Sequence, residues 1–252
     1  MNIADLEGKI INADCMDILK ELPNKAIDLI LTDPPYGGGG AICGKVVKEG
    51  VSAGGLTNTI SVARTGGTWS KKYQKGGHFN KVHRQNSPGG KWKNYDNGSD
   101  IRHWDIAPDQ NYFDEIFRVS KEQIIWGGNY FNLPPTRCFN IWKKLTISEN
   151  FSMAMAEYAW VSCNKNAKLW EFAPQDSKRF HPTQKPVKLI EKQLLEYSKE
   201  GDLILDPFSG SGTTAIACHR LKRRFICIEK DPEYWAKSVE RLKAEQAQLQ
   251  LF

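Results

Sequence analysis

The chain has 252 residues and a formal net charge of +6, and 40% of its residues are hydrophobic. This length is sufficient for one sizeable hydrophobic core, or for one core with a small additional lobe. No apolar stretch is long enough to cross a membrane, and the first eight residues are too polar for a signal peptide. The six cysteines lack C-x-x-C spacing, so we expect buried thiols in a reducing compartment and no metal site.

The first predicted elements alternate between strand and helix. Lys9–Ala13 is expected to form a strand, Asp14 to open a helix over Cys15–Leu22, and Ile27–Leu31 to form the next strand. The third segment is short, unbroken and rich in branched aliphatic residues. These properties are typical of a strand buried on both faces of a parallel sheet.

The tetrapeptide Asp33-Pro34-Pro35-Tyr36 follows this strand. Its prolines cannot donate backbone hydrogen bonds, so strand pairing must stop there and leave a rigid turn at the carboxyl end of the strand. Open α/β sheets bind their ligands at that edge. A carboxylate and free carbonyls beside an aromatic ring suit a planar base with an exocyclic amine. The alternative is an ordinary turn that ends a strand.

The segment Gly37–Trp104 carries all the excess positive charge. It contains eleven Lys/Arg against three acidic residues, a net charge of +8, whereas the rest of the chain has a net charge of −2. It also holds 15 of the 21 glycines and six aromatic residues. We expect a basic insertion that neutralises nucleic-acid phosphates and contacts bases rather than a solvated loop. The candidate residues are Lys71, Lys72, Lys75, Lys81, Arg84, Lys91 and Lys93.

Strands and helices alternate again after the insertion. Helices are predicted at Asp109–Val119, Pro186–Lys199, Thr213–Leu221 and Asp231–Gln248, strands at Gln123–Trp126, Cys138–Trp142, Glu157–Val161 and Phe225–Ile228, and loops at Lys143–Ser152 and Ser162–Arg179. This alternation predicts an α/β fold, a mostly parallel sheet with helices on both faces.

A second motif lies near the other end of the chain. An apolar strand ends at Asp206 and leads into Pro207-Phe208-Ser209-Gly210-Ser211-Gly212-Thr213. The two glycines let the backbone turn tightly and approach a ligand, and the next strand ends in Glu229, 17 residues after Gly212. An acidic residue at this position can accept hydrogen bonds from ribose hydroxyls. The sequence therefore predicts a nucleoside site here.

These motifs resemble the DNA amino-methyltransferases that use S-adenosylmethionine, in the beta class, where D-P-P-Y precedes F-x-G-x-G. Ile11–Cys15, Ile124–Phe131 and His181–Pro186 resemble three further segments of that family. The resemblance implies a circularly permuted Rossmann-like fold with seven strands, the last pair forming an antiparallel edge. It implies one catalytic domain from residues 1–36 and 105–252, interrupted by the insertion at 37–104.

The resemblance also implies roles for individual residues. Asp33, Pro34, Pro35 and Tyr36 would be catalytic. The expected cofactor-binding residues are Asp14, Cys15, Asp33, His181, Thr183, Lys185, Asp206, Phe208, Ser209, Gly210, Gly212, Thr213 and Glu229. Two of these have simpler explanations, because Lys185 could be a solvated residue before a helix and Asp14 could only cap its helix.

Within the family, Asp rather than Ser in the first position of the tetrapeptide favours the N6 amine of adenine in duplex DNA as the substrate. The alternatives are methylation of cytosine N4, RNA methylation and a DNA-binding homologue without activity. The resemblance further suggests a homodimer and a cognate restriction endonuclease as partners. It implies a cytoplasmic location in a bacterial cell or a phage-infected host.

Overall fold

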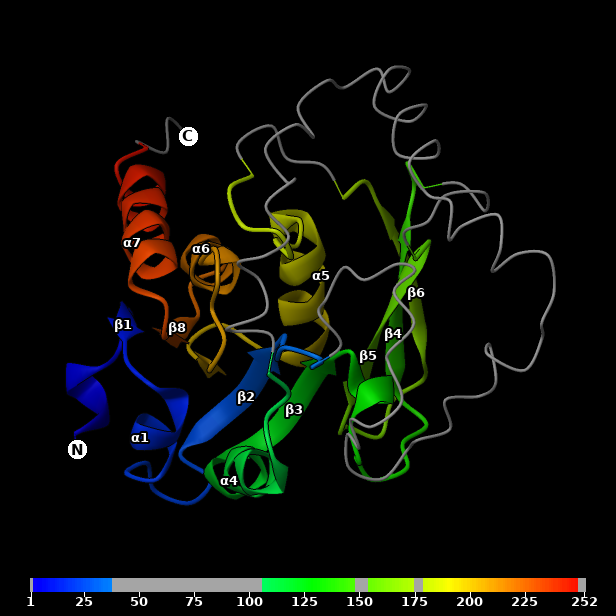
Figure 1. The fold of residues 1–252 in the computed structure, drawn as a ribbon, viewed down its shortest axis with the longest axis horizontal. Helices are drawn as coiled ribbons and strands as arrows, with labels where there is room; N and C mark the ends of the chain where they lie inside the picture. The colour runs from blue at the N-terminus through cyan, green and yellow to red at the C-terminus, as the bar shows by residue number, and fades with distance from the viewer. Residues whose placement is uncertain (1, 38–105, 148–153, 175–178, 249–252) are drawn as a thin grey trace, which may run out of the picture. The chain divides into compact units, whose positions relative to one another are not determined.

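A single mixed β-sheet runs through the described part of the chain, which in this computed structural model comprises residues 2–37, 106–147, 154–174 and 179–248 (Figure 1). In sheet order β1-β8-β7-β2-β3-β5-β4-β6, the described residues form eight strands. Their bounds are β1 (Lys9–Asn12), β2 (Ile27–Thr32), β3 (Ser120–Trp126), β4 (Phe139–Lys144), β5 (Ala156–Val161), β6 (Lys168–Phe172), β7 (Leu203–Asp206) and β8 (Arg224–Glu229).

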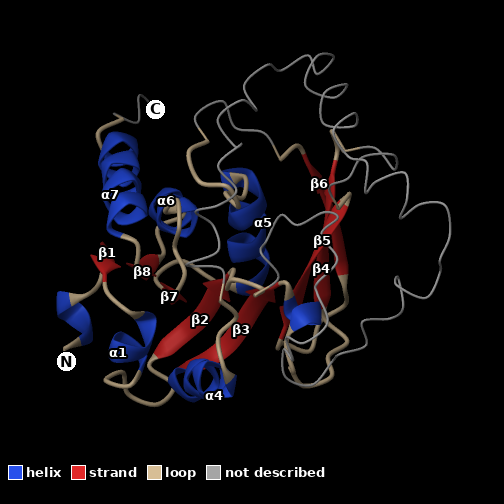
Figure 2. Cartoon of the chain, viewed as in Figure 1, coloured by secondary structure: helices blue, strands red, loops and turns tan. Residues whose placement is uncertain are grey.

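The helices of the described residues cover both faces of this sheet, as predicted (Figure 2). Their bounds are α1 (Cys15–Leu19), α4 (Gln110–Val119), α5 (Val187–Tyr197), α6 (Thr213–Arg220) and α7 (Pro232–Gln246), with short 3₁₀ turns η1 (Ile3–Asp5) and η4 (Gly128–Tyr130). Along β2, Leu29 and Leu31 belong to the core that includes residues of α5 and α6. Ile30 belongs to the opposite core, with residues of α1 and α4. The two-residue period of the strand thus supplies both cores.

The expectation of seven strands, the last pair antiparallel at the edge, is wrong. β5 pairs antiparallel with both β3 and β4, so it is the strand that runs against the others within the described sheet. β6 then adds to β4 in parallel register and forms the edge. It lies within 162–179, where the sequence predicts a loop. None of its five residues is fully buried, Trp170 and Phe172 pack against the core only partly, and Leu169 is 60% exposed, so the strand lacks the clear alternation of apolar and polar residues on which sequence prediction depends.

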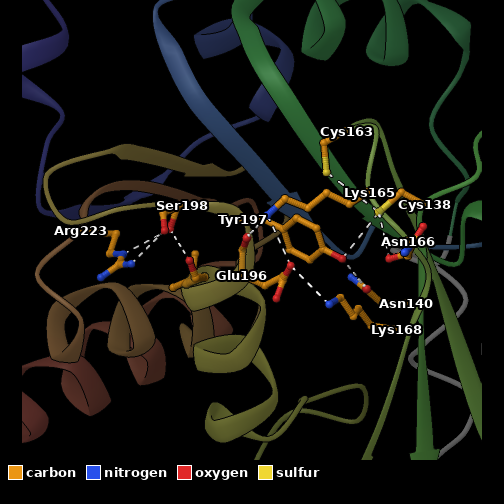
Figure 3. Close-up of polar contacts among 11 residues, drawn as sticks. Cys138, Asn140, Cys163, Lys165, Asn166, Lys168, Glu196, Tyr197, Ser198 and Arg223 are labelled. Atoms are coloured by element: carbon orange, nitrogen blue, oxygen red, sulfur yellow. Dashed lines mark hydrogen bonds and ion pairs between the residues drawn. The ribbon is translucent and has the colours of Figure 1, made fainter.

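The C-terminal end of α5 is fixed to the β4 side of the sheet, as Figure 3 shows. The Tyr197 hydroxyl donates a hydrogen bond to Oδ1 of Asn140 in β4 at 2.8 Å. The Nζ atoms of Lys165 and Lys168 lie 3.4 and 3.6 Å from Oε1 of Glu196. This attachment holds the helix in place, and therefore also the segment that enters it.

Caps explain where several helices begin. The Asp14 side chain accepts a hydrogen bond from the Met16 N–H at 3.0 Å, as predicted, and Asp231 accepts two from the first turn of α7. α1 ends at Leu19, three residues earlier than expected. No helix of the described residues combines the length and apolar character needed to cross a membrane.

Candidate active site at the carboxyl edge of the sheet

Five neighbouring parallel strands, β1, β8, β7, β2 and β3, end at one edge of the sheet. Parallel neighbours bring their carboxyl ends together, so residues far apart in the chain meet there. Glu229, Asp206 and Asp33 end or follow β8, β7 and β2, and Gly127 follows β3. The two sequence motifs, about 170 residues apart, are therefore adjacent at this edge.

The Asp33 carboxylate is held by two side chains. The Tyr36 hydroxyl donates a hydrogen bond to Oδ1 at 2.6 Å, and the Lys185 ammonium donates to Oδ2. Burial raises the pKa of Asp33, although the neighbouring Lys185 opposes this shift. Burial and the Asp33 charge together raise the pKa of Tyr36 well above its ordinary value, so this hydroxyl remains a donor. The arrangement presents an oriented, partly buried acceptor.

The Tyr36 ring is fixed by its neighbours. It stacks on Tyr130 with 4.8 Å between ring centroids and an interplanar angle of 20°, and Phe131 meets it edge-on. Gly127 has φ of +66°, and a Cβ there would lie 2.1 Å from Cε1 of Tyr36. Tyr130 was not among the site residues expected from the sequence. The Gly-Gly pair before it is nevertheless a signal that another group packs closely against the backbone there.

Lys185 lies deeper than a solvated residue before a helix would. Its side chain is only 6% exposed and its Nζ lies 3.3 Å from Oε2 of Glu157, in addition to its bond with Asp33. The two carboxylates raise the pKa of Lys185 although burial alone would lower it, so the ammonium stays charged. Glu157 was not expected at the site, because a charged residue in a predicted strand normally faces solvent.

The glycine turn between β7 and α6 has the conformation that the sequence predicts. Gly210 and Gly212 have φ of +51° and +73°, a region that disfavours other residues. The Gly210 N–H donates to Oε2 of Glu229 at 2.7 Å, and the Asp231 N–H donates to Oε1 at 2.9 Å. Burial raises the pKa of Glu229, and these backbone donors oppose it. Glu229 thus lies against the turn, as a nucleoside site requires.

The residues around this turn are mostly buried and internally bonded. Asp206 accepts hydrogen bonds from the Thr214 hydroxyl and the Phe208 N–H, and burial raises its pKa to about 7. Ser209 and Thr213 are 6% exposed. Thr213 Oγ1 lies 3.0 Å from Arg241, whose guanidinium donates to it.

His181 and Thr183 also lie beside the turn. A Cβ on Gly210 would be 3.3 Å from the His181 ring, a tight contact that glycine avoids. Burial lowers the pKa of His181 to about 4, which keeps its ring neutral. The Thr183 hydroxyl lies 3.2 Å from Nδ1 of the same ring.

Asp14 and Cys15 follow β1 at the far side of the edge. Asp14 caps α1 through one oxygen, and its second oxygen pairs with Lys230, the residue after Glu229, at 2.8 Å. The Cys15 thiol is 8% exposed, and burial raises its pKa to about 12. Its side chain belongs to the core, so a contribution to ligand binding would come from its backbone. The seven basic residues proposed to contact DNA lie outside the described residues.

The site fits a nucleoside cofactor with a charged amino-acid tail. A Cβ at Gly210 would be in tight contact with the His181 ring, and the carboxylate of Glu229 accepts a hydrogen bond from the Gly210 N–H. A partly buried acceptor, Asp33, lies at the neighbouring strand end. This donor and acceptor set suits ribose hydroxyls at one end of the site and an amine at the other.

Comparisons with known proteins identify the family of the chain. Residues 70–240 match the family model N6_N4_Mtase, described as DNA methylase. The chain is 28% identical to the type II methyltransferase M2.DpnII of Streptococcus pneumoniae over 272 residues, covering 94% of this chain and 90% of that protein.

Two solved structures share the fold. One is a putative DNA modification methylase of Thermus thermophilus complexed with S-adenosyl-L-methionine, with 17% identity, a TM-score of 0.51 and coverage of 94% and 93% of the two chains. The other is the PvuII DNA methyltransferase, described as cytosine-N4-specific, with 15% identity, a TM-score of 0.52 and coverage of 94% and 90%.

Proposed function

Because the chain belongs to the N6/N4 DNA methylase family, we propose that it methylates the N6 amine of adenine in duplex DNA. The observation that carries this proposal is the Asp33 carboxylate, partly buried at the end of β2, oriented by Tyr36 and Lys185 and adjacent to the glycine turn. Asp in this position of the tetrapeptide favours adenine over cytosine within the family.

The methyl donor is S-adenosylmethionine, which supplies an electrophilic methyl group on a sulfonium and departs with the electron pair of the broken bond. In this chain, Glu229 would accept hydrogen bonds from its ribose hydroxyls. The turn at Gly210 and Gly212 would give its backbone close access, and the end of β1 at Asp14 would face its adenine. Lys185 is the residue that the family resemblance places near its carboxylate. Because Lys185 also pairs with Asp33, its ammonium would in addition orient the catalytic carboxylate.

Asp33 would act on the amine directly. The nitrogen lone pair is delocalised into the base and is a poor nucleophile until the nitrogen becomes tetrahedral. Hydrogen bonds from the amine to the Asp33 carboxylate and to the Pro34 carbonyl favour that geometry, and they strengthen as the nitrogen gains positive charge. The lone pair then forms the new N–C bond as the bond from the methyl carbon to sulfur breaks, the sulfur keeps that electron pair, and the nitrogen gives up one proton to solvent.

Tyr36 would present a face to a base extruded from the duplex, since stacking would otherwise hide the amine. One side of its ring is occupied by Tyr130, which is 63% exposed and can move without disrupting the core. Pro35 holds Tyr36 at a fixed distance from Asp33.

We propose that the basic segment 37–104 contacts the DNA. It would be a target-recognition insertion within the catalytic domain of residues 1–36 and 105–252. Its seven candidate residues would neutralise phosphates, and the aromatics between them would contact bases. A homodimer and a cognate restriction endonuclease are further proposed partners. Sedimentation of the purified chain tests the first, and the genes beside its own test the second.

The product identifies the function. The chain is incubated with isotopically labelled S-adenosylmethionine and with random-sequence pools of duplex DNA or RNA, and the digested nucleosides are separated by mass spectrometry. We expect label in N6-methyladenine from duplex DNA. Label in N4-methylcytosine would identify the cytosine alternative, label from the RNA pool alone would identify an RNA enzyme, and no label would contradict the proposed activity.

A further inference from the structure

Four charged side chains of alternating sign run from β4 to the end of β2. The Nζ of Lys144 lies 2.6 Å from Oε1 of Glu157, whose other oxygen lies 3.3 Å from the Nζ of Lys185. Lys185 in turn binds Asp33. We call Lys144, Glu157, Lys185 and Asp33 the charge row. Only its last member belongs to the tetrapeptide.

The two lysines of the charge row are buried against tryptophans. Their side chains are 7% and 6% exposed. The Nζ of Lys144 lies 5.2 Å from the Trp142 ring centroid, and that of Lys185 lies 4.8 Å from the Trp126 centroid. The two indoles contact each other edge-to-face at 6.3 Å. Such packing fixes the positions of both ammonium groups and keeps water from screening them.

In this arrangement the Lys185 ammonium pairs with two carboxylates, those of Asp33 and Glu157. Burial opposes ionisation of Glu157, but Lys185 and Lys144 hold its pKa below its usual value, so it stays anionic. Burial raises the pKa of Asp33, Lys185 lowers it, and the charge of Glu157 raises it further. Glu157 therefore offsets part of the effect that Lys185 has on Asp33, and Lys144 offsets part of the effect of Glu157.

We infer that Glu157 and Lys144 are positioning residues that hold Lys185 in place, where Glu157 limits how strongly the Lys185 ammonium neutralises the acceptor Asp33 and Lys144 in turn moderates the effect of Glu157. The consequence for methyl transfer rests on the proposed function, in which Asp33 accepts a hydrogen bond from the amine. An Asp33 carboxylate fully neutralised by Lys185 would be a weaker acceptor for the developing charge on nitrogen.

A merely structural ion-pair network makes a different prediction. Removal of one partner from a buried pair is destabilising whichever partner is removed. It does not require that the ionisation of Asp33 respond with opposite sign to loss of Glu157 and loss of Lys144. The direction in which the pKa of Asp33 changes in each variant therefore distinguishes the two explanations.

Other titratable groups face the charge row and have to be held constant. Among the described residues, Tyr36 binds Asp33, Asp206 on β7 interacts with Asp33 through its charge, and His181 interacts with Lys185. None of these is changed in the variants below, so a difference between variants reports on the substituted member of the row.

The first test measures the ionisation of Asp33 itself in the DNA-free chain. The ¹³C resonance of its carboxyl carbon, assigned by its loss in Asp33→Asn, is titrated in the wild type, Glu157→Gln and Lys144→Met. We expect the midpoint to fall by about half a unit or more in Glu157→Gln and to rise in Lys144→Met. The double variant should return toward the wild-type value. Unchanged midpoints, or shifts in the same direction, would overturn the inference.

The second test measures single-turnover methyl transfer to duplex DNA across the same pH range. The acid limb of the rate should move with the carboxyl midpoint in each variant. The plateau rate of Glu157→Gln should fall by about tenfold, while the KM values for cofactor and DNA stay within about twofold of wild type. A wild-type chain that transfers no methyl group would contradict the proposed function alone, since the carboxyl titration still decides the inference.

Conservative variants separate charge from packing. Glu157→Asp and Lys144→Arg keep the charges of the row, and we expect each to leave the Asp33 midpoint nearer the wild-type value than its neutral counterpart does. If Glu157→Gln does not fold, the comparison of Lys144→Met with Lys144→Arg still decides the sign. A shift of equal size in both Lys144 variants would overturn the inference.

Discussion

At the scale of single residues, the site depends on charges that burial makes costly and that neighbouring groups make tolerable. Asp33 forms an ion pair with Lys185, and Glu157 forms ion pairs with both Lys144 and Lys185. Asp206 differs from these, because its partners are the neutral Thr214 hydroxyl and a backbone N–H. Without a cation beside it, its carboxyl is the one expected to control stability near neutral pH.

Asp206→Asn should therefore change the pH dependence of stability. Burial raises the folded-state pKa of Asp206 to about 7, against about 3.9 in the unfolded chain. The folded state then binds the proton more tightly, so this group's destabilisation is complete above pH 7 and is relieved as pH falls toward 4. We expect the neutral variant to be more stable than wild type at pH 8, by about 1 to 4 kcal/mol.

Denaturant unfolding at pH 8, 7, 6 and 5 without cofactor measures this difference. The advantage of Asp206→Asn should shrink at each step toward pH 5. An advantage that is the same at all four values would show that Asp206 titrates normally in the folded chain.

At the scale of elements, the site lies where the parallel strands end. How well each element could be predicted from the sequence depends on how deeply it is buried. β2 and β7 could be predicted because their residues are nearly all buried and aliphatic, and the motifs after them share one sheet edge. β6 could not, since its apolar residues do not alternate with polar ones and none of its residues is fully buried. The Lys144–Glu157 pair could not either, because it depends on the antiparallel register of β4 and β5, which local patterns do not encode.

Gly127→Ala tests how the end of β3 holds the Tyr36 ring. The new Cβ would lie 2.1 Å from that ring, so the ring has to move away from Asp33. We expect single-turnover methyl transfer to fall by about a hundredfold, the scale of a misplacement near 1 Å. Positive φ adds about 1–2 kcal/mol of backbone strain.

Gly8→Ala is the matched control for this substitution. Gly8 has φ of +74° and no atom within 4 Å of an added Cβ, so it incurs the backbone strain without the clash. Its stability loss should be similar and its transfer rate close to wild type. Equal rates in the two variants, after correction for folded fraction, would show that the ring position is not controlled by Gly127.

At the scale of the whole molecule, the excess positive charge and the two motifs of the proposed active site lie in different segments of the chain. The segment 37–104 has a net charge of +8, whereas the remainder, which includes both motifs, has a net charge of −2. This division predicts that DNA affinity and cofactor affinity can be altered separately. Phosphate contacts are salt-dependent, whereas a nucleoside site of hydrogen bonds is much less so.

Joint substitution of Lys71, Lys72 and Lys75 by Gln tests this division. DNA affinity should fall, and the slope of log affinity against log salt should flatten by about one unit for each phosphate that is no longer neutralised. Cofactor affinity should hold. The control is joint substitution of Lys188, Lys192 and Lys243, three exposed lysines outside the segment. An unchanged slope in the first variant would assign DNA binding to other residues.

The most direct test of the account is Asp33→Ala, because Asp33 is where the oriented acceptor, the charge row and the proposed amine meet. Calorimetry with S-adenosylmethionine and single-turnover methyl transfer to duplex DNA are measured on the same folded preparation. We expect cofactor affinity to be largely retained and the transfer rate to fall by at least about a hundredfold, the usual effect of removing one preorganised electrostatic interaction. A wild-type rate in this variant would remove Asp33 from the mechanism and contradict the account.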